Sequence, residues 1–246
     1  MQPHASPRRK GFYVLPNLFT TGALFAGFYA IVQAMNGNFD HAPVAIFVAM
    51  VFDGLDGRIA RWTHTESDFG VQYDSLSDMV SFGLAPSLVM YEWALTGLGK
   101  VGWLAAFIYA AAAALRLARF NAQSDEPHAI HFTGLPSPSA AAVVAGFVWI
   151  MMSFGVPGRE ISVLALLITV FAAGTMVSNI EYWSPKTINL KSRVSFVTIL
   201  VVVLGIVLIS LDPPRVLFGG FMAYALSGPL LAATRAWRRH HGHAGM

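Results

Sequence analysis

Four aspartates have the residue type and the spacing that chemistry needs: Asp53, Asp56, Asp74 and Asp78. The first two are three residues apart and the last two are four apart, so in helices each pair shares one face. Carboxylates that face one another in an apolar setting repel strongly unless cations lie between them. We therefore predict that these aspartates bind two divalent metal ions.

The ligands that the sequence offers narrow the choice of metal. The chain contains no cysteine, which excludes disulfides, thiolate metal sites and cysteine nucleophiles. Carboxylate oxygens are hard ligands and favour Mg²⁺ or Mn²⁺ over zinc. Two such ions suit a diphosphate substrate, because they neutralise its charge and stabilise a leaving phosphate oxygen.

Small residues accompany the aspartates on the same helix faces. Gly57 and Ala60 continue the stripe that begins at Asp53, and Gly70 lies one turn before Asp74. A bulky ligand can lie against the bare backbone at such positions. The alternative, that the aspartates only cap helix ends, does not account for glycines inside a helix, each of which costs about 1 kcal/mol relative to alanine.

The helices that carry these residues belong to a membrane protein. The hydrophobic fraction is 55%, the charged fraction is 12% and the mean hydropathy is +0.57, well on the apolar side of soluble domains. The basic residues form no stripe for nucleic acid, which we do not expect as a partner. We predict an all-α polytopic membrane protein with about eight transmembrane helices and a polar active-site cavity in the cytoplasmic half. The predicted spans are residues 15–35, 42–62, 72–95, 101–120, 138–155, 161–181, 194–211 and 215–234.

The basic residues also indicate how the chain is oriented. With both termini cytoplasmic, 13 of the 16 Lys and Arg residues lie at the cytoplasmic side, and only Lys100, Arg159 and Arg215 lie at the other. This asymmetry follows the positive-inside rule and favours the cytoplasmic (inner) cell membrane. The expected organisation is a basic cytoplasmic segment at residues 1–14, a single transmembrane catalytic domain at 15–236 and a cytoplasmic tail at 237–246.

The second predicted span is unusual because its uninterrupted apolar part is short. Ala42–Phe52 gives about 16 Å of helix, against a hydrocarbon core of about 30 Å. To cross the membrane, this helix must carry Asp53 and Asp56 into its cytoplasmic half. Ionisable residues at that depth are costly and usually line a wet functional cavity.

The segment from Asp53 to Asp78 resembles the signature of the CDP-alcohol phosphatidyltransferase family, D-x2-D-G-x2-A-R-x8-G-x3-D-x3-D. Its fixed places are filled by Asp53, Asp56, Gly57, Ala60, Arg61, Gly70, Asp74 and Asp78. Enzymes of this family move a phosphatidyl or other substituted phosphoryl group from a CDP-linked donor to an alcohol and release CMP. The resemblance therefore implies a metal-dependent transferase.

The resemblance also implies roles for the residues of the signature. The first three aspartates correspond to the family's metal ligands. Asp78 corresponds to the general base for the attacking hydroxyl and also contacts the second metal. Gly57, Ala60, Arg61 and Gly70 are the implied contacts of the CDP-linked donor. We expect direct in-line attack without a covalent enzyme intermediate, since the chain has no cysteine and no cluster of Ser, His and acid lies near the motif.

Three further stretches resemble the bacterial and archaeal phosphatidylserine synthase branch of the family: Leu15–Phe28, Ala114–Asn121 and Phe132–Ala141. Eight spans also suit this branch better than the six that are usual in the wider family. The branch implies CDP-diacylglycerol as donor and L-serine as acceptor, giving phosphatidylserine and CMP. The alternatives are the same chemistry on choline, inositol phosphate or glycerol phosphate, and a cation transporter whose aspartates form an ion path.

Polar residues in these stretches have two interpretations each. Asn17, Thr20 and Thr21 either begin the first helix or bond the cytosine or diphosphate of the donor. Arg116 and Arg119 are three residues apart on one helix face, where they either anchor the helix at the cytoplasmic side or pair with a substrate carboxylate or phosphate. We predict donor contacts for Asn17 and Thr20, and acceptor or phosphate contacts for both arginines.

The expected partners beyond the substrates are membrane lipids and a second copy of the chain. The resemblance implies a homodimer, and the run Ala110–Ala114 suits close helix packing within or between protomers. The C-terminal His240, His241 and His243 either chelate metal or belong to a solvated tail, and we interpret them as tail residues.

Overall fold

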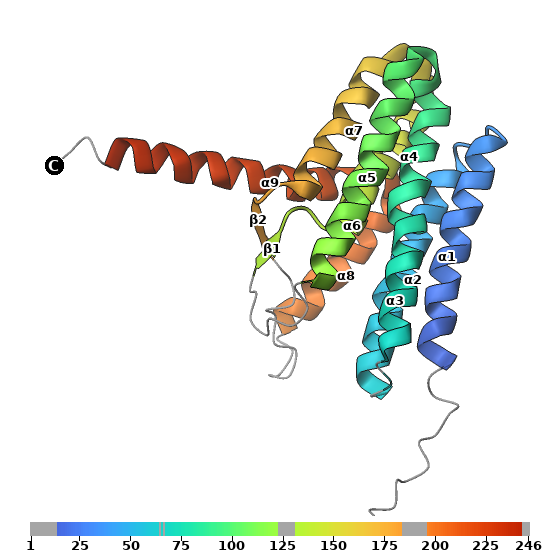
Figure 1. Ribbon diagram of the computed structural model, residues 1–246, viewed down its shortest axis with the longest axis vertical. Helices are drawn as coiled ribbons and strands as arrows, with labels where there is room; N and C mark the ends of the chain where they lie inside the picture. Colours follow the sequence, from blue (N-terminus) through green and yellow to red (C-terminus); the bar gives the residue numbers. More distant parts are fainter. Residues whose placement is uncertain (1–13, 64, 66, 123–130, 184–195, 243–246) are drawn as a thin grey trace, which may run out of the picture.

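The computed structural model describes residues 14–63, 65, 67–122, 131–183 and 196–242 (Figure 1). Its α-helices are α1 (Val14–Met35), α2 (His41–Thr63), α3 (Asp68–Asp78), α4 (Ala85–Met90), α5 (Lys100–Ala122), α6 (Ser137–Ser153), α7 (Ser162–Val177), α8 (Phe196–Leu211) and α9 (Pro213–Gly242). A π-helical turn at Met79–Leu84 joins α3 and α4 into one rod, and a second one at Tyr91–Leu95 follows α4. 3₁₀ turns lie at Thr96–Leu98 and Gly158–Ile161. Two short strands are β1 (His131–Thr133) and β2 (Glu181–Trp183).

The predicted all-α membrane class is confirmed, with the small two-stranded sheet as an addition. Four helices in the described ranges are long and apolar enough to cross a membrane: Leu15–Met35, Lys100–Ala122, Gly158–Val177 and Pro213–Arg235. Two apolar helices, Ser137–Ser153 and Leu200–Leu211, are shorter. The number of eight spans therefore stays a prediction.

Small residues allow the first helices to pack closely. An alanine face of α1 is at most 6% exposed and lies in one core with α2; it consists of Ala23, Ala26, Ala30 and Ala34. A Cβ added at Gly27 would clash with the backbone and side chain of Ser81, so α1 lies very close to the π-helical turn that follows α3. Close approach of this kind is how helices associate where lipid removes the hydrophobic driving force.

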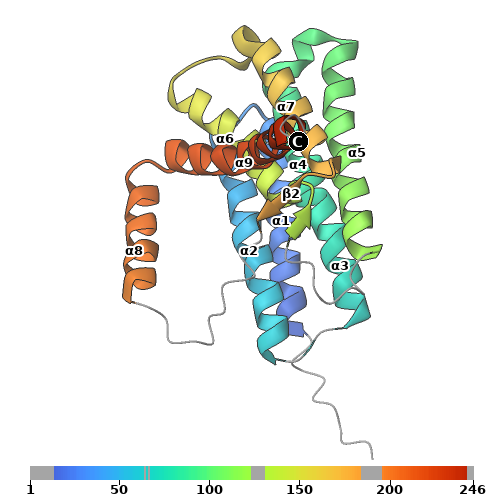
Figure 2. The ribbon, with the colours of Figure 1, turned by 90° about the vertical axis from the view of Figure 1, so that its left-hand side faces the viewer.

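The arrangement of the last two helices differs from that of the helices before them (Figures 1 and 2). α6 is buried along Ala140–Val148, and α9 lies across it instead of running beside the other helices (Figures 1 and 2). Aromatic packing holds α9 in this position, because the Phe218 ring lies 5.9 Å from Phe147 of α6 and the Phe221 ring lies 6.4 Å from Phe47 of α2. The predicted span 215–234 thus lies in a helix that packs across α6. Helix α8 lies at the edge of the molecule in Figure 2.

The two strands tie together the segments that follow α5 and α7. They pair antiparallel with Phe132 opposite Tyr182. Directly after β1, the Gly134 amide donates to the Ile180 carbonyl at 2.8 Å. Gly134 has a φ of +81°, and a Cβ there would clash with the Met176 carbonyl, so glycine is required. This contact fixes the point at which α6 begins.

Candidate active site

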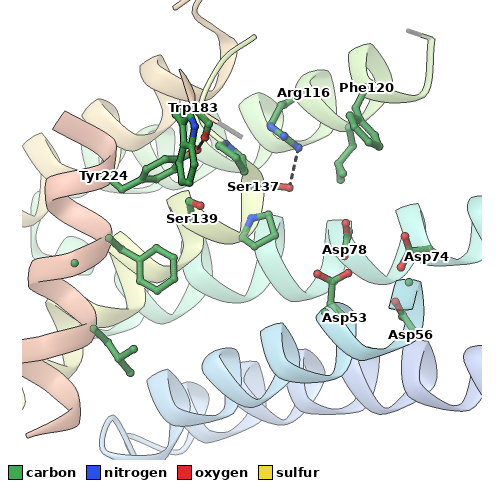
Figure 3. Close-up of a pocket in the computed structure, with 18 of the residues that line it drawn as sticks. Asp53, Asp56, Asp74, Asp78, Arg116, Phe120, Ser137, Ser139, Trp183 and Tyr224 are labelled. Atoms are coloured by element: carbon green, nitrogen blue, oxygen red, sulfur yellow. Dashed lines mark hydrogen bonds between the residues drawn. The ribbon is translucent and has the colours of Figure 1, made fainter. Parts of the chain in front are cut away.

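The structure brings the four predicted aspartates together at one end of a cavity. Oxygens of Asp53, Asp56 and Asp74 lie within 4.8 Å of one another. The Asp78 carboxyl faces Asp53 within hydrogen-bonding reach (Figure 3). Helical spacing explains the arrangement: α2 presents one pair and the rod of α3 presents the other.

The environment of these carboxyls fits a divalent cation. Asp56 is 5% exposed, and its Oδ2 accepts a hydrogen bond of 2.8 Å from the Thr20 hydroxyl. The Oδ1 of Asp74 is buried and has no hydrogen-bond partner among the described residues. Buried acceptors are normally satisfied, and hard carboxylate oxygens are the ligands of Mg²⁺ and Mn²⁺. A cation held by Asp53, Asp56 and Asp74 would satisfy the orphaned oxygen.

The residues predicted to contact the donor surround a pocket beside the aspartates. This pocket has a volume of about 480 Å³, and all six predicted donor residues line it: Asn17, Thr20, Gly57, Ala60, Arg61 and Gly70. Asp56 and Asp74 also line it. The Ser67 hydroxyl caps the N-terminus of α3 by accepting a hydrogen bond from the Gly70 amide at 3.1 Å. Helix α3 therefore begins at Asp68, four residues before the start of the predicted span 72–95. The predicted donor residues therefore share one compartment with two of the aspartates.

The two threonines of α1 differ in their surroundings. Thr20 is 3% exposed, and its hydroxyl is engaged by Asp56. Thr21 instead lies 2.9 Å from the Tyr73 hydroxyl, oxygen to oxygen, and borders a separate apolar groove between α1 and α2. Of the two hydroxyls, only the one on Thr20 reaches the aspartates.

The larger cavity extends from the aspartates toward the C-terminal helices and measures about 840 Å³. Its polar part contains all four aspartates together with Arg61, Arg116, Ser137, Ser139 and Tyr224. Its apolar part is formed by α8 and α9 and includes Ile209, Val216, Leu217 and Phe221. One cavity thus contains both charged side chains and a hydrocarbon-like wall.

Arg116 lies in this cavity across from the aspartates (Figure 3). It is 8% exposed, and its Nη1 donates to the Ser137 hydroxyl at 3.3 Å. Its Nε is buried without a hydrogen-bond partner in the described part of the chain. The Phe120 ring centroid lies 5.9 Å from the guanidinium carbon. A buried guanidinium with a free donor is suited to an anionic group of a ligand.

Arg119 is placed differently although it lies only one turn further along α5. Its guanidinium donates to the carbonyls of Val177 at 3.2 Å and Ser178 at 3.4 Å. It also donates to the side-chain oxygen of Asn179 at 3.4 Å. Arg119 is not among the residues that line the described cavity. The structure therefore places Arg116 at the cavity and Arg119 at the C-terminal end of α7.

Several lining residues were not predicted from the sequence. Ser137 and Ser139 begin α6, Trp183 comes from β2 and Tyr224 comes from α9, where its hydroxyl donates to the Trp183 carbonyl at 3.0 Å. The serines fall in the stretch Phe132–Ala141, which the sequence marks only by its resemblance to one branch of the family. The other two are far from the motif in sequence, and no local pattern marks them.

Beside this site, Tyr182 of β2 anchors α9 to the small sheet. Its phenol is 1% exposed and donates to the Ala225 carbonyl at 3.0 Å. Burial, together with the nearby Tyr224, raises the pKa of Tyr182 to about 12, so the hydroxyl stays protonated and keeps its donor role at neutral pH.

Residues 13–178 match the family described as CDP-alcohol phosphatidyltransferase. The chain belongs to the CDP-alcohol phosphatidyltransferase family. Every residue of the signature falls within the matched range, and the crossing helix α9 lies outside it. The predicted family and the predicted enzyme class are confirmed: the chain is a transferase of this family.

Curated relatives resemble the chain over most of its length. A CDP-diacylglycerol–serine O-phosphatidyltransferase of Helicobacter pylori is 32% identical over 214 residues, which cover 87% of this chain and 90% of the relative. One of Mycobacterium bovis is 31% identical and covers 93% of this chain and 81% of its own. An archaetidylserine synthase of Methanothermobacter thermautotrophicus is 32% identical, with 70% of each chain covered.

Proposed function

We propose that this phosphatidyltransferase moves the phosphatidyl group from CDP-diacylglycerol to L-serine, giving phosphatidylserine and CMP. The observation that carries the proposal is a buried arginine with a free donor that shares one cavity with the four aspartates. Serine has a carboxylate to pair with such a group, and the relatives named above as serine phosphatidyltransferases support this acceptor.

The donor end of the site is the aspartate end. Two ions, Mg²⁺ or Mn²⁺, held by Asp53, Asp56 and Asp74 with Asp78 at the second, would neutralise the diphosphate and lower the pKa of a bound hydroxyl. The pocket formed by α1, α2 and α3 receives the cytidine nucleotide, because Gly57 and Ala60 leave room against the α2 backbone. Arg61 borders both the pocket and the larger cavity, which suits a contact to the diphosphate.

The chemical step is a single displacement at phosphorus. The serine hydroxyl oxygen forms a bond to the phosphorus of the phosphatidyl group while the bond from that phosphorus to the CMP oxygen breaks. Asp78 takes the proton of the attacking hydroxyl, since its carboxyl faces the cavity between the other aspartates and Arg116. The negative charge leaves with CMP, and no covalent enzyme intermediate forms.

Arg116 is the proposed contact of the serine carboxylate. Its Nε is free, and the Ser137 hydroxyl fixes the other side of the guanidinium. The free donor lets it bind a planar carboxylate in the geometry that arginine favours. The Arg119 guanidinium donates hydrogen bonds to carbonyls at the C-terminal end of α7. We therefore propose that it supports the site without contacting the acceptor.

The cellular setting is part of the proposal. We propose eight spans in the inner cell membrane, both termini and the active site on the cytoplasmic side, one catalytic domain over residues 15–236, and a homodimer. Lipid substrate would enter laterally between helices. Several of the basic residues on which this orientation depends lie outside the described residues: those at 8–10, Lys186, Lys191 and Arg193. His243 also lies outside them.

The test is CMP release by the purified enzyme from CDP-diacylglycerol, with Mn²⁺ or Mg²⁺ or with EDTA. We expect CMP only when metal and L-serine are both present. Release with choline, inositol phosphate or glycerol phosphate, but not with serine, would keep the chemistry and overturn the acceptor. Ion flux through vesicles that contain the protein, without release of CMP, would favour the transport alternative. The family membership already opposes that alternative.

A further inference from the structure

Two hydroxyls on different helices form a chain of contacts that runs from Ser77 through the residue Thr20 to Asp56. The Thr20 hydroxyl of α1 donates to Asp56 Oδ2 of α2 at 2.8 Å. The Ser77 hydroxyl of α3 donates to the Thr20 backbone carbonyl at 3.1 Å. All three residues are at most 5% exposed. The chain therefore connects the three helices that form the aspartate end of the site.

The direction of the first bond follows from its acceptor. A carboxylate only accepts, so Thr20 must donate its single hydroxyl proton. The Pro16 carbonyl lies 3.2 Å from the same hydroxyl, but the carboxylate is nearer and forms the stronger, charge-assisted bond. A ligand that accepted a hydrogen bond from the Thr20 hydroxyl would have to replace Asp56 as the acceptor.

Ser77 behaves unlike its neighbour on the same helix. The Ser75 hydroxyl donates to the Val71 carbonyl four residues back, which is the usual local bond of a helical serine. Ser77 instead reaches across to α1 from a position between Asp74 and Asp78. It thereby fixes how α3 lies against the same turn of α1 that holds Asp56.

We propose that Thr20 and Ser77 are positioning residues, which orient the Asp56 carboxyl toward the other aspartates and hold the two aspartate pairs in register for the cation. This assigns Thr20 to the metal end and removes it from the nucleotide contacts. The inference rests on the proposed binding of divalent ions by the aspartates.

Ser81 supplies a matched control. Its hydroxyl donates to the Ala23 carbonyl at 2.9 Å, about one turn beyond the Ser77 bond, and it is fully buried. Ser81→Ala removes the same kind of bond between α1 and the π-helical turn that continues α3, but that bond does not lead to a carboxylate. An effect of Ser77→Ala that Ser81→Ala lacks is therefore specific to the chain that ends on Asp56.

The experiment measures Mn²⁺ binding by electron paramagnetic resonance on the full-length enzyme in detergent, without substrates. Removal of outer hydrogen-bond partners costs about 10- to 100-fold in metal affinity. We expect a loss in this range for Thr20→Val, a smaller loss for Ser77→Ala, and wild-type affinity for Thr20→Ser and Ser81→Ala. Binding of CDP in the presence of saturating Mn²⁺ should be unchanged in all four variants.

Each other outcome overturns the inference in a distinguishable way. Wild-type Mn²⁺ affinity in Thr20→Val with weakened CDP binding would make Thr20 a nucleotide contact. Equal losses of Mn²⁺ affinity in Ser77→Ala and Ser81→Ala would mean that both bonds contribute only to helix packing. If Thr20→Val does not fold, the comparison of the two serine variants decides alone. Failure of the wild-type enzyme to bind Mn²⁺ would overturn the metal proposal itself and the inference with it.

Discussion

The two ends of the large cavity are built in different ways. The aspartate end comes from one continuous stretch, Asp53 to Asp78, in which helical spacing alone puts each pair of carboxyls on one face. The Arg116 end joins α5, the start of α6, strand β2 and α9. The first is local and charged, whereas the second depends on how distant segments pack. In the proposed function, the donor binds at the local end and the acceptor at the assembled end.

The largest expected effect is at the aspartate end. Asp78→Asn removes the proposed base, so turnover should fall about 10³-fold. Binding of CDP should stay near the wild-type value, because the three principal metal ligands remain. Single-turnover CMP release together with CDP titration checks both parts. A variant that keeps near-normal turnover would break the assignment of Asp78 as base.

A second variant separates binding from chemistry at the same end. Asp56→Asn replaces a proposed metal ligand, and loss of a ligand should cost more than the 10-fold minimum seen for outer partners. We therefore expect metal-dependent CDP binding to weaken by at least about tenfold. Calorimetric titration with CDP, with and without Mn²⁺, measures this. If the variant bound CDP as tightly as the wild type, Asp56 would not be a metal ligand.

The smallest expected effect concerns the assembled end. Arg119→Gln removes hydrogen bonds from a charged donor to the end of α7, which should lower the stability of the fold by about 1–2 kcal/mol. Thermal unfolding in detergent measures the loss. The KM for serine should not change, and a rise in this KM with unaltered stability would move Arg119 into the acceptor site.

Helical periodicity predicts which carboxyls of the aspartate end share a helix face. Spacings of three and four residues gave the shared faces, and small residues beside them gave the space for a ligand, so Gly57, Ala60 and Gly70 were found with the carboxyls. The bond from Thr20 to Asp56 was not predictable, because it depends on the register of α1 against α2. From the sequence, Thr20 is predicted to contact the donor, not to bond an aspartate.

Local sequence patterns do not predict the assembled end either, because it depends on how distant segments pack. Arg116 and Arg119 share a helix face, yet one turn of α5 is enough to direct the first to Ser137 and the second to α7. Hydropathy predicted an apolar helix at residues 215–234, but not that it crosses α6. That crossing is set by contacts of aromatic residues such as Phe218, and it brings Tyr224 to the cavity.

The most direct test of the two-ended site is the response of Arg116→Met to both substrates. Methionine keeps much of the length of the side chain and removes the charge. We expect a serine KM raised about tenfold to hundredfold, with CDP binding unchanged and with no such rise in Arg119→Met. An unchanged serine KM in Arg116→Met, or a loss of CDP binding equal to the loss of serine affinity, would overturn the assignment of Arg116 to the acceptor.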